Sequence, residues 1–148
     1  MALADDGRGT REFDKFVADS SGNTGIRVVT TAHETLSTSA TVTVNDTSGN
    51  GDTIIDAYDI TGKQRVGLQF VNAGAVTATF KVWGSLVASP GNPVANPANW
   101  CQIGDDVEVT ASEDTKYKAM STTPVKWIMV TGIVASSTAS CTAYLMAD

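Results

Sequence analysis

Hydrophobic and polar residues alternate along most of the chain from residue 26 onward. In the stretch 65–71, for example, Val66, Leu68 and Phe70 fall on one face and Gly67 and Gln69 on the other. A period of two predicts strands that bury one face. The pattern predicts roughly nine or ten strands, within residues 26–30, 40–45, 53–58, 65–71, 76–86, 100–103, 107–110, 115–120, 126–135 and 141–146.

Short strands separated by turns, with no sustained helical period, are typical of an antiparallel β-sandwich or jelly roll. The 20 threonines support this expectation, because β-branched side chains favour strands. A chain of 148 residues is long enough for one hydrophobic core and needs no second domain. We therefore predict an all-β fold, with residues 26–148 as the sandwich domain.

The first 20 residues differ from the rest because they hold eight of the chain's 26 charged residues. Phe13, Phe16 and Val17 recur at helical spacing, which predicts a single turn or short helix. A segment this polar cannot build a core of its own. Residues 1–25 are therefore expected to form an arm that packs onto a neighbour or onto the flank of the domain, or else a frayed terminus.

Three turn-rich segments carry recognisable signals. Residues 72–74 (Asn-Ala-Gly) separate two strong strands and predict a hairpin. Residues 89–99 contain three prolines, so we expect a stiff loop that projects and carries contacts. Residues 46–52 resemble the start of a calcium loop, but Ala57 stands where a bidentate Glu belongs, so a plain turn is favoured.

No group of residues has the pattern of a catalytic or metal site. His33 is the only histidine and lies in no nucleophile or metal motif. A glycosidase would need a pair of carboxylates, which the segment with Asp105, Asp106 and Glu108 could in principle supply. Alternation along this segment instead directs Asp106 and Glu108 toward solvent. We predict no enzymatic activity, no metal and no cofactor.

The two cysteines, Cys101 and Cys141, are 40 residues apart in the sequence. We expect both to be reduced, buried, small apolar residues. A disulfide stays open as an alternative if two strands bring their Cα atoms within about 7 Å.

The net charge of −6 argues against nucleic acid as a partner, because an acidic surface repels phosphates. The chain contains no window of about 18 apolar residues, so the sequence predicts no membrane span. The first residues lack the basic and apolar regions of a signal peptide, so we expect synthesis and assembly in a cytoplasm.

Tryptophans are the remaining candidates for contacts. Trp83 falls on the polar face of its strand, and Trp100 follows the proline-rich loop. An exposed tryptophan can stack on a sugar ring or anchor an interface. The alternative is that Trp127 lies in the core and Trp83 covers a sheet edge.

Several stretches resemble tailed-bacteriophage virion proteins. EFDKFV at 12–17, with the turn at 19–23 and IRVV at 26–29, resembles a segment common in such proteins. Four further stretches resemble small β-sandwich capsid decoration (cement) proteins, namely IIDAYDI at 54–60, RVGLQFVNAG at 65–74, TFKVWGSL at 79–86 and KWIMV at 126–130.

This resemblance implies a protein on the outer surface of a capsid, assembled in the host cytoplasm. It also implies attachment to the major capsid protein, often as a homotrimer that clamps neighbouring capsomers. The arm residues that we expect to make this contact are Arg8, Arg11, Phe13, Lys15 and Phe16. Similar sequences occur in head fibres and tails. The alternative is therefore an adhesion module that binds host glycans through Trp83 or Trp100 and the proline-rich loop.

Overall fold

The computed structural model describes residues 13–18, 24–28, 35–93, 95–111, 114–121 and 125–148. The chain divides into two compact units, residues 1–33 and residues 34–148. The expected division after residue 25 falls earlier than this boundary, because residues 24–28 pair with residues 13–18 inside the first unit. No helix in the described residues has the length and hydrophobicity that crossing a bilayer requires.

The first unit contains an antiparallel pair of strands, β1 (Phe13–Ala18) and β2 (Thr24–Val28). Phe13 pairs with Val28, and Val17 pairs with Gly25. The helical turn predicted from Phe13, Phe16 and Val17 is therefore wrong. A single isolated helical turn fixes several residues for one hydrogen bond, whereas pairing with β2 gives the segment several backbone hydrogen bonds on one of its edges.

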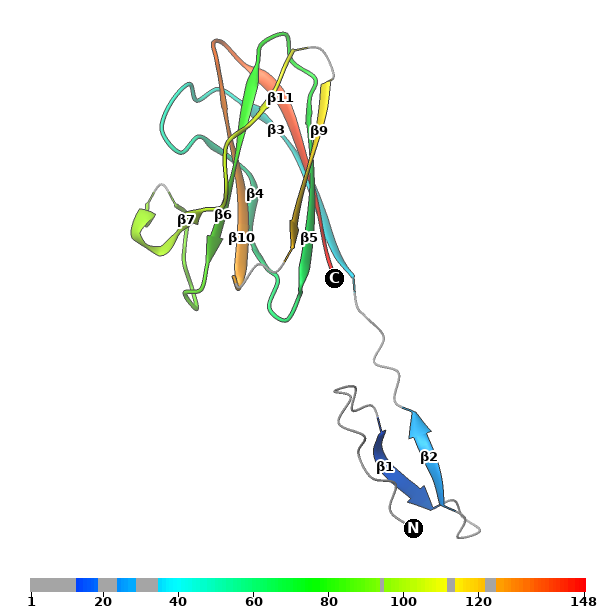
Figure 1. Cartoon of the computed structure of the whole chain (residues 1–148). Helices are drawn as coiled ribbons and strands as arrows, with labels where there is room; N and C mark the ends of the chain where they lie inside the picture. Colours follow the sequence, from blue (N-terminus) through cyan, green and yellow to red (C-terminus); the bar gives the residue numbers. More distant parts are fainter. Residues whose placement is uncertain (1–12, 19–23, 29–34, 94, 112–113, 122–124) are drawn as a thin grey trace. The chain divides into compact units, whose positions relative to one another are not determined.

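The second unit is an antiparallel sandwich of nine strands, and it confirms the all-β fold. In Figure 1 its two sheets lie face to face. The four-stranded sheet has the order β3 (Leu36–Val44), β11 (Ala139–Ala147), β5 (Arg65–Asn72) and β9 (Asp114–Ser121). The five-stranded sheet has the order β4 (Asp52–Asp59), β10 (Trp127–Val134), β6 (Ala78–Ser85) and β7 (Cys101–Gln102), with β8 (Val107–Val109) also paired to β6.

The last two strands of the chain occupy the middle of the two sheets. β10 lies between β4 and β6 in the five-stranded sheet. β11 lies between β3 and β5 in the four-stranded sheet. Each sheet is therefore joined together by a strand that is synthesised after its neighbours.

The core lies between the two sheets, where the alternating apolar residues meet. Val66, Leu68 and Phe70 of β5 are buried, as the sequence pattern predicts. Phe70 stacks on Phe80 of β6, with ring centroids 4.8 Å apart. This aromatic pair joins the sheets near the middle of the core. Stacked aromatic pairs add about 0.5–1.5 kcal/mol beyond the burial of their surface.

The hairpin predicted at residues 72–74 is wrong, because β5 and β6 belong to different sheets. Asn72 is fully buried and organises the crossing. Its side-chain nitrogen donates to the carbonyl oxygens of Val76 (2.7 Å), Val109 (3.0 Å) and Thr110 (3.1 Å), and its oxygen accepts from the Gly74 amide. These bonds tie the Asn72 side chain to the segment that follows it and to the end of β8, and they hold the chain where it passes from one sheet to the other.

Candidate functional site

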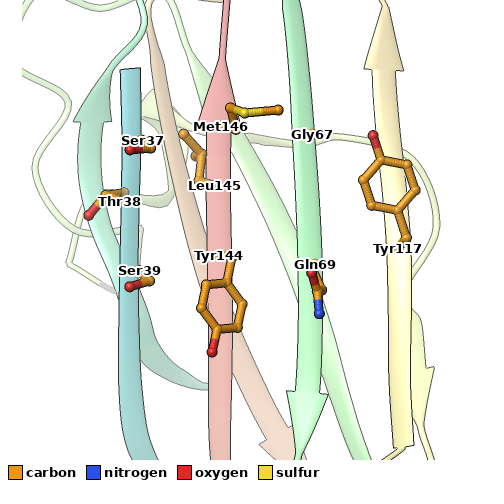
Figure 2. A pocket seen from close by; sticks show the side chains of 9 residues that line it. All are labelled: Ser37, Thr38, Ser39, Gly67, Gln69, Tyr117, Tyr144, Leu145 and Met146. Carbon is orange, nitrogen blue, oxygen red and sulfur yellow. The ribbon is translucent and has the colours of Figure 1, made fainter. Parts of the chain in front are cut away.

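The outer face of the four-stranded sheet carries three large exposed side chains close together. Tyr117 is 70% exposed, Tyr144 46% and Met146 56%. They come from β9 and β11, the strands on either side of β5. Figure 2 shows them on one face of the sheet, with Gln69 between the two tyrosines. This cluster of exposed aromatic and apolar side chains makes the face a candidate contact surface.

Strand register places these side chains in one row. Tyr144 pairs with Ser39 on one side and with Gln69 on the other, and Gln69 pairs with Tyr117. Neighbouring strands lie about 4.8 Å apart, so the two tyrosine Cα atoms are separated by about 10 Å across β5. Gln69 is exposed and presents its amide between the rings.

Gly67, which has no side chain, leaves room for the Tyr117 ring beside this row. Gly67 is two residues from Gln69 on the same face of β5, and a Cβ atom there would lie 3.1 Å from the Tyr117 hydroxyl oxygen. A larger residue at this position would displace the ring. The resulting groove has a volume of about 480 Å³. We call it the tyrosine groove; it is lined by Ser37, Thr38, Ser39, Gly67, Gln69, Tyr117, Tyr144, Leu145 and Met146.

The tyrosine groove lacks charge although the chain as a whole is acidic. None of its lining residues carries a charged side chain at neutral pH. The neighbouring residues Lys116 and Lys118 alternate onto the opposite face of β9. At one end of the sheet, Arg65 forms a two-pronged ion pair with Asp148, which compensates both charges. The groove therefore offers aromatic rings, hydroxyls and an amide in a neutral setting.

The outer face of the five-stranded sheet is covered instead of open. Met129 and Thr131 of β10 are fully buried although they point away from the core. The Thr131 hydroxyl donates to the Asn50 carbonyl oxygen and accepts a 2.9 Å bond from the Trp83 indole nitrogen. Trp83 is thus half-buried and engaged within the protein. Its predicted role as a surface contact is not supported by this placement.

The proline-rich loop packs on the protein through part of its length, while residues 95–98 are exposed, so the expected projection holds only for that part. Pro90 and Pro93 are buried, and the Asn92 side chain donates to the Thr53 hydroxyl at 3.0 Å. Trp100 is only 6% exposed, and its indole nitrogen donates to the Gly91 carbonyl oxygen at 2.8 Å. Trp100 is therefore an anchor for the loop. The prediction that it forms a surface contact is wrong.

Three of the five predicted arm contacts belong to β1. Arg8 and Arg11 lie outside the described residues, as does His33. Phe13, Lys15 and Phe16 belong to β1, of which the structure describes the backbone. Their role as partner contacts stays a prediction.

The acidic residues serve local structure. The Asp52 carboxylate accepts the backbone amides of Asn45 (2.7 Å) and Asp46 (3.0 Å), which supports a plain turn at residues 46–52. Asp106 and Glu108 are exposed, as predicted. Across the described residues, no group of three or more His, Cys, Asp or Glu side chains is placed to hold a metal ion.

One lysine supports the loop that carries the acidic residues. Lys118 donates to the carbonyl oxygens of Ile103 (2.9 Å) and Asp105 (3.0 Å). Burial lowers the pKa of the Lys118 ammonium, and the charges of Asp105 and Asp106 oppose that shift. Lys118 thus stabilises the backbone of residues 103–105.

The two cysteines are free and lie in different sheets. Cys141 of β11 is fully buried, as predicted, and burial raises the pKa of its thiol to about 11. Cys101 of β7 is exposed, which corrects the prediction that it is buried. Its strand has only two residues and borders the proline-rich loop, so alternation over so short a segment could not fix which way the side chain points.

The tyrosine groove was missed at the level of sequence. The alternation of 141–146 already separates Tyr144 and Met146 from Ala143 and Leu145, and that was the available signal. The order of the strands was not available. Tyr117 and Tyr144 are 27 residues apart, and only the order β11-β5-β9 brings them to one groove.

Comparisons with known proteins add little to this description. No family model matches the chain, and no curated protein matches it. Among solved structures, a chain of the disulfide-linked pili that form Bacillus endospore appendages is 6% identical. The alignment covers 76% of this chain and 86% of that chain, with a TM-score of 0.39. A likeness at this level carries no argument about function.

Proposed function

We propose that this chain is a non-enzymatic structural virion protein that decorates and stabilises a bacteriophage capsid. In this proposal its first unit binds the major capsid protein and its sandwich remains on the outer surface. The resemblance of short stretches within residues 12–130 to phage virion proteins, four of them to decoration proteins, supports the viral setting. The division of the chain into a small hairpin unit and a complete sandwich supports the mode of attachment.

The observation that carries the proposal is the two-stranded sheet of the first unit. β1 and β2 have six and five residues and, among the described strands, pair only with each other. A two-stranded sheet by itself is marginally stable in water. It gains stability when a partner adds strands or covers one face. The sandwich needs no such help, because residues 34–148 hold a complete core.

A homotrimer would strengthen this attachment. Linked copies turn the second and third contacts into intramolecular steps, so that weak single contacts add up to firm binding. A capsid with threefold positions offers matching sites. We therefore include the trimer in the proposal, and the mass of the purified protein in solution is the measurement that checks it.

The placement of Trp83 and Trp100 does not favour the alternative, in which these two side chains bind glycans. Trp100 is buried under its loop, and the Trp83 indole nitrogen is bonded to Thr131. Trp100 cannot stack on a sugar while it is buried, and Trp83 is half-buried with its indole nitrogen already bonded. Part of the proline-rich loop is packed on the protein through Asn92.

The test compares full-length protein with residues 34–148 for binding to heads of the same virus assembled without this chain. We expect the full-length protein to saturate the heads and the shortened protein to bind far less. A Leu86→Ala variant, which changes a 72% exposed side chain on the sandwich, serves as the control and should bind normally. Equal occupancy by the full-length and shortened proteins would contradict attachment through the first unit.

A further inference from the structure

We propose that the tyrosine groove is a binding site for a neutral saccharide. The site lies entirely within residues 37–146 of the sandwich unit. It goes beyond the proposed capsid attachment, which involves the first unit. Three properties of the groove lead to this ligand class: its stacking surfaces, its polar groups and its lack of charge.

The two tyrosine rings provide the stacking surfaces. A pyranose ring has a face of C–H bonds, and such a face packs on the electron-rich face of an aromatic ring. Tyr117 and Tyr144 lie on either side of β5 and are 70% and 46% exposed. The Cα atoms of the two tyrosines are about 10 Å apart across β5, and the Tyr117 ring lies over Gly67 of that strand, so one short saccharide can contact both rings.

Polar groups lie where the hydroxyls of such a ligand would fall. Gln69 presents an amide between the rings, and its oxygen and nitrogen can accept and donate hydrogen bonds. Ser37 and Ser39 present exposed hydroxyls on the neighbouring edge strand β3. A few placed polar groups on an otherwise aromatic surface are typical of sites that fix the orientation of a small ligand.

Charge and size narrow the ligand further. The chain carries a net charge of −6, yet the groove lining is uncharged and the nearby ion pair of Arg65 with Asp148 is internally compensated. A sialylated or sulfated sugar would find no cation among the lining residues. The volume of about 480 Å³ is sufficient for a short saccharide.

The experiment applies full-length protein to an array of short neutral oligosaccharides and their sialylated and sulfated counterparts. We expect retention on neutral saccharides and none on the anionic counterparts. Titration calorimetry with the best neutral ligand then compares Tyr117→Ala and Tyr144→Ala with wild type. Each substitution should weaken binding by about tenfold or more, because each removes one stacking surface.

Three further variants make the result specific to the groove. Tyr144→Phe keeps the ring and should bind close to wild type. Gly67→Leu keeps both tyrosine residues but displaces the Tyr117 ring from its place over β5, so binding should be lost. Leu86→Ala, an exposed apolar residue outside the groove, should have no effect. Urea unfolding checks that every variant folds.

Several results would overturn the inference. These are failure to retain any neutral saccharide, preference for the anionic counterparts, and full binding by a Tyr117→Ala/Tyr144→Ala double variant. The outcome is independent of capsid attachment, because the shortened protein of residues 34–148 keeps the whole groove. A protein that decorates heads but binds no sugar would refute this inference and leave the proposed function in place.

Discussion

Asn72 shows how one buried amide redirects the chain. Its side chain makes four hydrogen bonds to backbone groups of two segments, residues 74–76 and residues 109–110. Such a residue is costly to remove, because the groups that it satisfies stay buried. The cost of leaving a buried polar group without a partner is about 1–3 kcal/mol.

We therefore expect Asn72→Ala to lower the free energy of unfolding by about 2–4 kcal/mol. Urea unfolding monitored by circular dichroism measures the effect. Gln69→Ala is the matched control, because it removes an exposed amide from the same strand and should change stability by less than about 0.5 kcal/mol. Similar losses for the two variants would show that Asn72 has no special role.

Gly51 occupies a position that no other residue fits well. Its φ is +81°, and a Cβ atom there would lie 2.7 Å from the Gly132 carbonyl carbon and 2.8 Å from Ile133 Cγ2. Gly49, in the same turn, has a φ of +73°, but a Cβ atom added to it would meet no other atom within 4 Å. The two glycines thus separate backbone strain from steric conflict.

We expect Gly49→Ala to cost about 1 kcal/mol, which is the strain of the left-handed backbone alone. Gly51→Ala should cost at least about 3 kcal/mol, because the backbone of β10 must also move. Thermal unfolding of both variants tests this difference. Equal melting temperatures would show that the turn adapts without disturbing β10.

The two cysteines differ in exposure. Burial raises the pKa of Cys141 from 9.0 to about 11, so the folded protein keeps this proton where the unfolded chain loses it. The free energy of unfolding contributed by Cys141 is therefore fully present below about pH 9 and is lost as the pH rises toward 11. At about pH 8, a thiol reagent should modify Cys101 quickly and Cys141 only on unfolding.

Mass spectrometry of the labelled protein checks this order of reaction. Cys141→Ala should remove the part of the alkaline loss of stability that comes from this thiol, whereas Cys101→Ala should not. Rapid labelling of Cys141 in the native protein would contradict its burial.

The two sheets of the sandwich differ in whether a turn covers their outer face. The turn at residues 45–51 closes over β10 through the bond between Asn50 and Thr131. The Lys81 ammonium adds a 2.7 Å bond to the Gly49 carbonyl oxygen. Both contacts hold the turn on the five-stranded sheet, while the four-stranded sheet keeps its outer face open.

We expect Thr131→Val to lower the free energy of unfolding by about 2 kcal/mol, because it leaves the Trp83 indole nitrogen and the Asn50 carbonyl without their partner. Hydrogen exchange in residues 45–51 should rise as well. Thr43→Val is the control, since Thr43 is exposed on β3 and the change suits a strand. Unchanged exchange in the turn would argue against this role for Thr131.

The positions of the strands could be predicted from the sequence, but their partners could not. The hydrophobic pattern and the turn signals located all nine strands of the sandwich, most of them by alternation, although β10 is buried on both faces and β7 has only two residues. The pattern missed β1, whose apolar residues also fit helical spacing. It gave no strand order, because pairing is set by contacts between distant segments. The false hairpin at residues 72–74 is the direct result.

The candidate site shows the same limit at the scale of the molecule. Tyr117 and Tyr144 each have an outward position that alternation implies, but their meeting depends on β5 lying between their strands. Trp83 and Trp100 became candidates because one faces outward by alternation and the other adjoins a loop. Their burial depends on two loops that fold over the five-stranded sheet, and loop paths leave no periodic signal in the sequence.

The two units should also behave independently in stability. Because residues 34–148 contain the whole core, removing residues 1–33 should leave the urea midpoint of the sandwich unchanged. Unfolding of both proteins under the same conditions measures this. A clear drop in the midpoint of the shortened protein would show that the first unit supports the sandwich in solution.

The central positions of β10 and β11 affect how the protein is made in the cell. Until the ribosome has added these strands, β3, β4, β5 and β6 lack their central partners and leave strand edges unpaired. Unpaired edges tend to join other chains, so a nascent chain is most prone to aggregate shortly before β10 and β11 emerge. Chaperone binding during this late stage of translation would therefore raise the yield of soluble protein.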